Sequence, residues 1–348
     1  MAAIRLAIIG YGSAGRGIHS RLAREAGFSV TVIVTNNRNR RQQAAADWPG
    51  ARLLADISEL PALRDRFDLA IIASPTASHA ENAAFLARAG IPFVVDKPLG
   101  VDAFEVRAII AEAAATGTPF TVFQNRRWDG EQLGAISAIE RGELGDVHTF
   151  ERRMEVWRPV IRTGWKEEDL VGGGLLLDRG VHLVDGAIQL FGPVTAVTAQ
   201  IRHLATATDD DVMLLLEHTP GGGVARSKFP VVSRLFTSTM VAAPGPRTKI
   251  LGTKAGYVVA GFDDFSVFEV AAAGVDGARD SGWLVQGSHL TPLPLPENAH
   301  VDFYARLPDW LAGETPAPVD PKDALASAIV LDAARTSARE RRTVPIGN

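Results

Sequence analysis

The sequence contains no cysteine, and this absence excludes several kinds of chemistry. Disulfide bonds, thiolate zinc sites, iron–sulfur clusters and a cysteine nucleophile all require that residue. No apolar stretch approaches the roughly 18–20 residues of a membrane-spanning helix, so we expect no membrane partner. The N-terminal run Met1-Ala-Ala-Ile-Arg-Leu lacks the basic region of a signal peptide. The expectation is a cytoplasmic protein.

A strong net charge is also missing. The chain has 36 Lys+Arg against 40 Asp+Glu, a formal charge of −4, which gives no electrostatic reason to expect a nucleic-acid partner. Hydrophobic residues make up 46% of the chain, so it is neither polar enough nor charged enough to stay disordered. Its 348 residues correspond to about two domains at roughly 150 residues each.

Short apolar runs alternate with longer helical stretches up to residue 124. Runs such as Ile4–Ile9, Val30–Val34 and Leu69–Ala73 are continuously apolar, as in strands buried on both faces. Strands that alternate with helices predict a parallel sheet. We therefore expect a Rossmann-type, doubly wound α/β domain over residues 1–124.

The pattern changes after residue 124, where strand-like runs follow one another with short turns. This predicts an α+β domain over residues 125–348, with a large, mainly antiparallel open sheet and flanking helices. Strands are expected at Val224–Val232, Leu235–Ala243 and Ser266–Ala271, among others. The proline-rich piece Pro292–Pro296 is expected to be a loop.

The motif Gly10-Tyr-Gly12-Ser-Ala-Gly15 follows the first predicted strand and opens the first predicted helix. Glycines at this spacing permit a tight turn and let a pyrophosphate approach backbone N–H groups at a helix start. A glycine-rich turn without a ligand is the alternative. We predict that this loop binds a dinucleotide cofactor through Gly10, Gly12, Ser13, Ala14 and Gly15.

The residues after the second strand bear on the choice of cofactor. No acidic residue occurs between Glu25 and Asp47, whereas an NAD site normally has an Asp or Glu there for the ribose 2′-hydroxyl. Hydroxyl, amide and guanidinium groups would instead bind a 2′-phosphate. The alternative is a solvated, basic helix start. NADP is expected to be preferred, with NAD possible, through Thr35, Asn36, Asn37 and Arg38.

Two further strand ends carry polar residues. Ligands of doubly wound sheets bind beyond the carboxyl ends of the strands. A lysine in Asp96-Lys97-Pro98, directly after the fifth strand, should therefore lie near a nicotinamide ring. In isolation this tripeptide is only a charged turn, and His79 is equally compatible with a helix-start histidine. The cofactor contacts expected here are Ser74, Pro75, Thr76, His79, Asp96 and Lys97.

The strongest pattern in the second domain is Gly172-Gly-Gly-Leu-Leu-Leu-Asp178-Arg-Gly-Val-His182-Leu-Val-Asp185. Asp178 and His182 are four residues apart and would share one face of a helix, with Asp185 on the same side. A carboxylate beside an imidazole can act as a proton relay, because it fixes the tautomer and raises the basicity. The structural alternative is a packed His182 and a capping Asp178.

A predicted strand before this motif carries candidate substrate contacts. Arg153, Glu155 and Trp157 would share one strand face, and such groups suit a hydroxyl-rich ligand. Arg–Glu pairs across a sheet are also common structural features. The expected substrate-binding set is Arg153, Glu155, Trp157, Arg162, Asp178 and His182. The run Asp209-Asp-Asp211 has no histidine at ligand spacing and is expected to be a solvated turn, so no metal site is predicted.

Taken in order, the glycine loop, Asp96-Lys97-Pro98 and the G-G-G-x-x-x-D-x-G-x-H-x-x-D pattern resemble the Gfo/Idh/MocA family of nicotinamide-dependent oxidoreductases. The resemblance covers essentially the whole chain. The usual family tripeptide is Glu-Lys-Pro, so Asp96 is a conservative departure. The resemblance implies that Lys97, Asp178 and His182 form the catalytic set.

Within the family, the run that starts at Gln124-Asn125, together with Trp165 and Pro244–Arg247, is similar to NADP-preferring inositol dehydrogenases of the scyllo-inositol type. This likeness adds Gln124, Asn125 and Trp165 to the expected cofactor contacts. Family members also pair through the sheet of the second domain, which implies a homodimer or homotetramer.

The expected reaction is hydride transfer between NADP(H) and a secondary alcohol or ketone of a polyol, sugar or inositol. It requires a base for the hydroxyl proton and a cation near the developing alkoxide. His182 is expected to take the proton, Asp178 to orient it, and Lys97 to hold the oxygen or share the proton. Two alternatives stay open: a glycosidase with a tightly bound nicotinamide, and a non-catalytic nicotinamide sensor.

Overall fold

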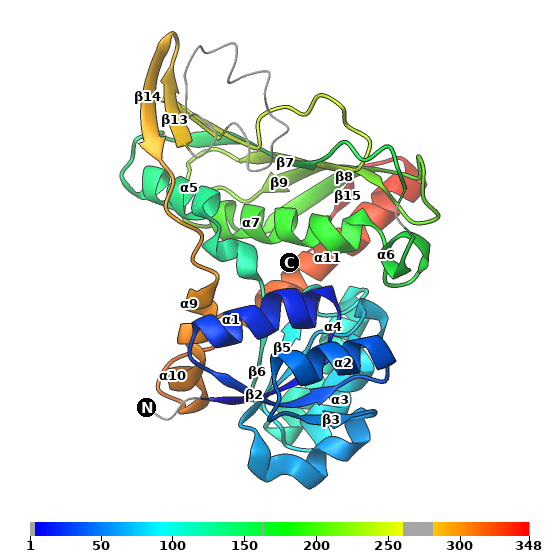
Figure 1. The fold of residues 1–348 in the computed structure, drawn as a ribbon. Helices are drawn as coiled ribbons and strands as arrows, with labels where there is room; N and C mark the ends of the chain where they lie inside the picture. Colours follow the sequence, from blue (N-terminus) through cyan, green and yellow to red (C-terminus); the bar gives the residue numbers. More distant parts are fainter. Residues whose placement is uncertain (1–3, 162, 260–280, 348) are drawn as a thin grey trace. The chain divides into compact units, whose positions relative to one another are not determined.

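The computed structural model describes residues 4–161, 163–259 and 281–347 (Figure 1). The chain divides into two compact units. The first contains Met1–Asn125 and Ala299–Leu325, and the second contains Arg126–Asn298 and Ala326–Asn348. The segment 299–325 therefore packs within the first unit although it follows most of the second in the sequence.

The first unit contains a six-stranded, all-parallel sheet of order β3-β2-β1-β4-β5-β6. The chain direction across the sheet reverses between β1 and β4, and this confirms the doubly wound Rossmann prediction. The strands are β1 (Arg5–Ile9), β2 (Ser29–Val34), β3 (Arg52–Leu54), β4 (Leu69–Ile72), β5 (Phe93–Asp96) and β6 (Phe120–Phe123); the helices between them include α1 (Ser20–Glu25), α2 (Arg38–Asp47), α3 (His79–Arg88) and α4 (Ala103–Thr116).

Local sequence explains these elements. All four residues of β4 are buried, as expected for a strand with helices over both faces of its sheet. Helix α4 starts at Asp102, whose carboxylate accepts a hydrogen bond from the N–H of Glu105, and it ends at Gly117 with φ 65°. An N-cap carboxylate and a left-handed glycine are favourable start and stop residues for a helix.

The segment that returns to the first unit forms α9 (Val301–Ala305) and α10 (Leu307–Leu311). A break separates these two short helices. The break falls before Pro308, which has no N–H for a continued helix. Phe303 packs edge-on against Phe123 of β6, with ring centroids 4.9 Å apart, and the hydroxyl of Tyr304 lies 2.7 Å from Nδ1 of His19.

The described residues of the second unit form a nine-stranded sheet of order β14-β13-β12-β11-β7-β10-β9-β8-β15. Among these strands only β7 and β10 pair in parallel, so the prediction of a large, mainly antiparallel open sheet is confirmed. Its strands are β7 (Val147–Glu155), β8 (Val194–Arg202), β9 (Asp211–His218), β10 (Val232–Ser238), β11 (Thr248–Gly252), β12 (Gly256–Val259), β13 (Ser281–Gln286), β14 (His289–Pro294) and β15 (Val344–Pro345).

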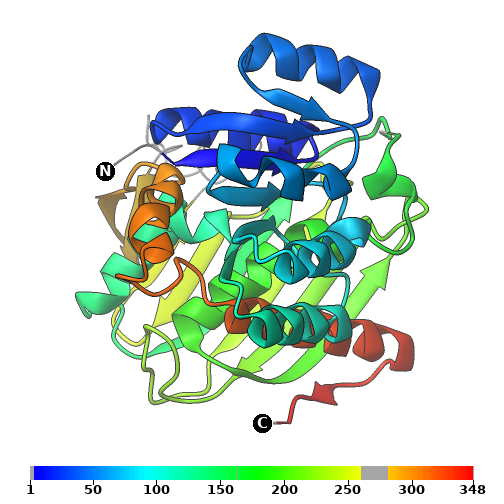
Figure 2. The same cartoon turned by 90° about the horizontal axis from the view of Figure 1, so that it is seen from below.

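Helices cover one face of this sheet (Figure 1). From below, the red helix α11 lies in front of the green strands (Figure 2). Among the described residues, no helix is long and apolar enough to cross a bilayer. The helices are α5 (Gly130–Glu140), α6 (Trp165–Glu168), α7 (Val181–Phe191) and α11 (Pro321–Glu340). The first residues of α11, up to Leu325, belong to the first unit.

Two predicted elements of the second unit differ from the structure, and a third lies outside the described residues. Residues 224–231 form turns and loop rather than a strand, because Gly221 and Gly223 have positive φ and Gly223 lies against the backbone of Leu190. The piece Pro292–Pro296 is partly strand: β14 is an edge strand, where a missing N–H can face away from the sheet. The predicted strand Ser266–Ala271 lies outside the described residues.

Candidate active site

The glycine loop follows β1 and leads into a π-helical turn, Gly15–His19, that continues into α1. Gly10 has φ +89°, and a methyl group there would lie 2.7 Å from the carbonyl oxygen of Ala73. A methyl group at Gly15 would collide with the carbonyl oxygen of Gly10. Side chains are therefore excluded at both positions, and the start of the helix stays open to a pyrophosphate.

The basic residues that follow β2 have different roles. Asn37 caps α2, since its side chain accepts a hydrogen bond from the N–H of Arg40 at 3.1 Å. Arg41 donates to the carbonyl oxygens of Thr35 and Leu53, so it holds the backbone together. The guanidinium of Arg40 reaches Gly12: its Cζ would lie 3.6 Å from a methyl group at that position.

The predicted cofactor contacts include Arg38 but not Arg40, whose guanidinium lies beside Gly12. Both side chains are exposed. An N-cap at Asn37 starts the helix at Arg38 and puts Arg40 near the end of its first turn, where it faces the glycine loop. The capping signal was therefore present in the sequence, but the orientation of the first turn was not.

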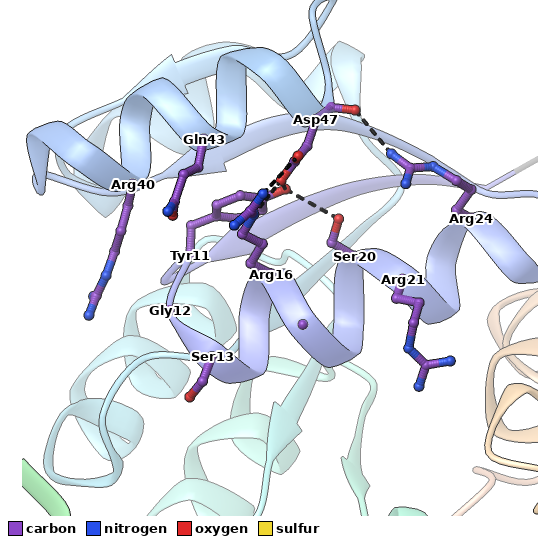
Figure 3. Close-up of a pocket in the computed structure, with 11 residues that line it drawn as sticks. Tyr11, Gly12, Ser13, Arg16, Ser20, Arg21, Arg24, Arg40, Gln43 and Asp47 are labelled. Carbon is purple, nitrogen blue, oxygen red and sulfur yellow. Dashed lines mark hydrogen bonds and ion pairs between the residues drawn. The ribbon is translucent and has the colours of Figure 1, made fainter. Parts of the chain in front are cut away.

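Beside the loop lies a pocket of about 640 Å³ between α1 and α2 (Figure 3). Arg16 forms an ion pair with Asp47 at 2.7 Å, and Tyr11 donates to the same carboxylate at 3.0 Å. The hydrogen bond from Arg16 is the main reason why the pKa of Asp47 is lowered. In Figure 3, Arg40 points down from α2 on the side of Gly12, and Arg21 points away from Asp47.

At the carboxyl ends of β4 and β5, the predicted residues come together. The Ser74 hydroxyl accepts hydrogen bonds from Ser78 at 2.7 Å and from Asn82 at 3.1 Å. Asp96 accepts the backbone N–H of Lys97 at 2.8 Å. The loop that carries Lys97 is thus fixed by the residue that precedes it. Pro75 is the residue before the short 3-10 turn Thr76–Ser78, in which Thr76 is buried.

Asp96 is half-buried and charged. Burial raises its pKa, but the neighbouring His19, Lys97 and His79 lower it by more, so that the net pKa lies below the usual range. Nε2 of His19 lies 3.7 Å from Oδ2 of Asp96. This carboxylate balances the positive charge around the Lys97 loop.

His79 lies between the two strand-end loops rather than at their surface. Its ring is 1% exposed, with Nδ1 2.8 Å from the carbonyl oxygen of Pro98 and Nε2 2.9 Å from that of Ser74. The predicted cofactor contact is therefore fully engaged by backbone. A histidine that only starts a helix would not make these two contacts.

Gln124 tests whether the unit fits a dinucleotide. It directly follows β6, is fully buried, and neither amide atom of its side chain has a hydrogen-bond partner among the described residues. A buried amide without partners is costly, so such a group points to a polar ligand. Asn125, the next residue, is half-buried and opens a 3-10 turn that ends at Trp128. The glycine loop, Arg40 and Gln124 together fit a nicotinamide dinucleotide.

In the second unit, the glycine run serves local packing. A methyl group at Gly173 would lie 2.6–2.8 Å from three carbonyl oxygens of the α6 turn, and Gly174 has φ +89° with the carboxylate of Asp209 against it. Asp209 in turn accepts the N–H of Leu176 at 2.6 Å. These contacts fix the start of the segment that carries the predicted catalytic residues.

Asp178 lies in a π-helical turn, Leu176–Gly180, rather than in the regular α-helix that its spacing to His182 predicted. Its carboxylate forms an ion pair with Lys166 at 2.6 Å, a partner that the sequence did not indicate. His182 follows in the first turn of α7 and is buried. Asp185 forms two hydrogen bonds with Arg127, at 2.6 and 2.8 Å, instead of supporting His182.

Asp178 also lines a pocket of about 170 Å³. Arg179 lines it too and donates to the carbonyl oxygen of Met154 at 2.9 Å. The lining combines cations, carboxylates and hydroxyl groups, which suits a ligand with several hydroxyl groups. The residues concerned include Arg158, Lys166, Asp178, Arg179, Thr206, Thr208, Asp209 and Thr239.

The acidic run beside this pocket is not a solvated turn as predicted. The Asp210 side chain is buried and accepts three backbone N–H groups, from Leu204, Ala205 and Thr206. Asp211 pairs with Arg202 at 2.7 Å. Burial raises the pKa of Asp209. No group of potential metal ligands occurs among the residues that the structure describes.

These two sites lie in regions that match one family. Residues 4–124 match the oxidoreductase family, NAD-binding Rossmann fold, and residues 136–346 match the oxidoreductase family, C-terminal alpha/beta domain. The chain belongs to the Gfo/Idh/MocA oxidoreductase family.

Relatives within this family span nearly the whole chain. The chain is 25% identical to scyllo-inositol 2-dehydrogenase (NADP(+)) IolW of Bacillus subtilis, covering 98% of this chain and 95% of that protein. It is 27% identical to inositol 2-dehydrogenase of Rhodococcus erythropolis, covering 75% and 72% of the two chains. A solved oxidoreductase structure from Klebsiella pneumoniae aligns with a TM-score of 0.82 at 31% identity, covering 99% and 96%.

The remaining predicted residues of this family member lie elsewhere in the second unit. In β7, Phe150 packs against Phe191 of α7, and Arg152 donates to Gln132 of α5 at 2.6 Å. Because side chains alternate along a strand, Arg153 and Glu155 point to the opposite, helix-free face. The structure therefore does not bring them together with His182.

Arg153 is engaged on that helix-free face. It pairs with Glu151 at 3.1 Å and with Glu155 at 3.7 Å, and its guanidinium lies over the ring of Phe236. Trp157 follows the end of β7 and is exposed, as is Trp165, which starts α6. Arg162 lies outside the described residues.

Proposed function

We propose that this family member transfers a hydride between NADP(H) and a secondary alcohol or ketone of a polyol, sugar or inositol. The observation that carries the proposal is the Lys166–Asp178 ion pair at the edge of a hydroxyl-lined pocket, one turn before His182. Neither a plain packing turn nor a structural cap requires a half-buried carboxylate that faces a pocket.

Each residue has a role in this proposal. Bound nicotinamide supplies the hydride acceptor or donor. His182 takes the hydroxyl proton as general base. Asp178, held by Lys166, accepts a hydrogen bond from the substrate and orients it. Lys97, fixed at the end of β5 by Asp96, places a positive charge beside the developing alkoxide.

The preference for NADP rests on the first unit. A carboxylate at the end of β2 would favour the free ribose hydroxyls of NAD, and this chain has Thr35 and two asparagines there. The Arg40 guanidinium beside Gly12 can bind a 2′-phosphate. The Bacillus subtilis relative is named for NADP(+), in agreement with this proposal.

The helix-free face of the second sheet supports an assembly. It carries half-buried apolar side chains such as Leu215 and Phe236 next to the Arg153 ion pairs. A second copy could cover this face by a two-fold interface, so we propose a homodimer or homotetramer.

One experiment separates this function from its alternatives. Nicotinamide absorbance is followed with NADP or NAD across inositols, aldoses and ketoses. Repeated turnover, faster with NADP, is the expected result. A retained cofactor with no net turnover would indicate a glycosidase that uses the nicotinamide transiently. Binding without any reaction would indicate a sensor, and faster turnover with NAD would contradict the cofactor preference.

A further inference from the structure

The contacts of His79 set a requirement on its protonation. Both ring nitrogens face backbone carbonyl oxygens, Pro98 at 2.8 Å and Ser74 at 2.9 Å. A carbonyl oxygen only accepts hydrogen bonds, and a neutral imidazole has a single N–H. A neutral ring can therefore satisfy one of the two contacts and leaves a lone pair against the other oxygen. Only the doubly protonated ring donates to both.

His218, another buried histidine, shows the contrasting case. Its Nδ1 faces the carbonyl oxygen of Gly192 at 2.9 Å, but its Nε2 faces the Ser233 hydroxyl at 2.8 Å. A hydroxyl can donate as well as accept, so a neutral ring satisfies both contacts. Burial lowers the pKa of His218 to about 4, in agreement with a neutral ring.

The charges around His79 act in both directions. Burial lowers its pKa, and Lys97 lowers it further, whereas the Pro98 and Ser74 carbonyls and the charge of Asp96 raise it. The net effect of these groups lowers the pKa of His79. A neutral ring would nevertheless hold a lone pair 2.8–2.9 Å from a carbonyl oxygen, and this repulsion favours the doubly protonated ring. Asp96 is the carboxylate that balances the ring, and its Oδ2 lies 3.7 Å from Nε2 of His19.

We propose that His79 is a positioning residue for Lys97, which ties the loop after β5 to the loop after β4 when both of its ring nitrogens carry a proton. Pro98 directly follows Lys97, so a ring that donates to its carbonyl fixes the backbone beside the lysine. Loss of one proton releases one of the two loops. The consequence for catalysis rests on the proposed function, but the two-proton state does not.

The first test needs no activity. The protein is labelled with ¹⁵N-histidine, and the His79 signals are assigned by their loss in H79Q. Two directly bonded ring protons at neutral pH are expected for His79, and one for His218. A single ring proton on His79 at neutral pH would overturn the proposal. This result would stand even if no substrate were found.

The second test is kinetic. In the wild type, kcat should fall about ten- to hundredfold as the pH rises through the titration of His79 seen by NMR, because a misplaced lysine reacts poorly. H79Q, whose amide nitrogen reaches one carbonyl only, should have a lower kcat without this dependence, and H79L should behave alike. H218Q is the matched control and should keep the wild-type profile. An unchanged pH profile in H79Q would contradict the positioning role.

Discussion

The two sheets of this protein differ in how many of their faces are covered, and this changes what a polar residue means. In the first unit, helices lie over both faces, so β4 is wholly apolar and polar groups occur where strands end. In the second unit, β7 alternates between a helix-covered face and an open one. A polar residue at a strand end of the first sheet therefore indicates a ligand site, whereas one inside β7 indicates an ion pair.

The largest effect is expected for Lys97, which follows a strand of the first sheet, and for His182, which lies at the start of α7. Lys97→Ala or His182→Ala should lower kcat by about 10²–10⁴-fold, because the reaction loses its cation or its base. NADPH binding, measured by fluorescence titration, should be retained. Near-normal turnover in both variants would show that the catalytic set lies elsewhere.

A buried charge on the covered face should have the next largest effect. Glu131 of α5 accepts hydrogen bonds from Arg247 and Thr248. Burial raises its pKa, but the charges of Arg247 and Arg152 and these bonds lower it from 4.5 to about 2. Glu131→Gln should lower the free energy of unfolding by about 3–5 kcal/mol, because it leaves buried guanidinium groups without their carboxylate.

Glu131 should also make the free energy of unfolding depend on pH. Because the folded pKa of Glu131 is depressed, its contribution to stability is present above pH 4.5 and is lost as the pH falls toward 2. Urea unfolding at several pH values should show a smaller loss in Glu131→Gln than in the wild type. Glu143→Gln, in a more exposed pair with Arg141, is the control and should change stability by less than about 1 kcal/mol. Equal pH curves for wild type and Glu131→Gln would contradict the assignment.

Arg40 tests the glycine-loop edge of the first sheet. Arg40→Ala should weaken NADPH binding by about ten- to hundredfold, since a charge-assisted hydrogen bond is worth roughly 1.5–3 kcal/mol, and leave NADH binding unchanged. Arg38→Ala removes an exposed arginine from the same helical turn and serves as the control. Equal losses for both cofactors, or a larger loss in Arg38→Ala, would remove Arg40 from the 2′-phosphate site.

The smallest effect is expected on the open face. Arg153→Ala should leave kcat and KM within about twofold of the wild type, because its side chain lies on the face of the sheet opposite to His182. A large rise in KM for a polyol would contradict this, and would return the open face to the substrate site.

The sequence sufficed for the fold and for the motifs, because both depend on periodicity and spacing. Strand ends, the glycine loop and the order of the family motifs are local features. Contacts made in space were not accessible in this way. Lys166 lies twelve residues before Asp178, and Arg40 reaches Gly12 only because α2 starts at a particular residue.

The alternation of side chains along β7 also did not show which of its two faces is covered by helices. Arg153 and Glu155 were correctly placed on one side of β7, but the side covered by helices could not be known from the strand alone. The two π-helical turns, at Gly15–His19 and Leu176–Gly180, likewise interrupt the four-residue spacing of a regular α-helix that the sequence analysis assumed.

The return of the chain to the first unit constrains the order of events during synthesis. The His19 ring contacts the Tyr304 hydroxyl across 285 residues of sequence, and Phe123 packs against Phe303. The first sheet can be translated early, but the aromatic layer beside β6 is absent until almost the whole chain has left the ribosome. A nascent chain stopped before residue 299 should therefore be sensitive to protease, and become resistant only when residues 299–325 have emerged.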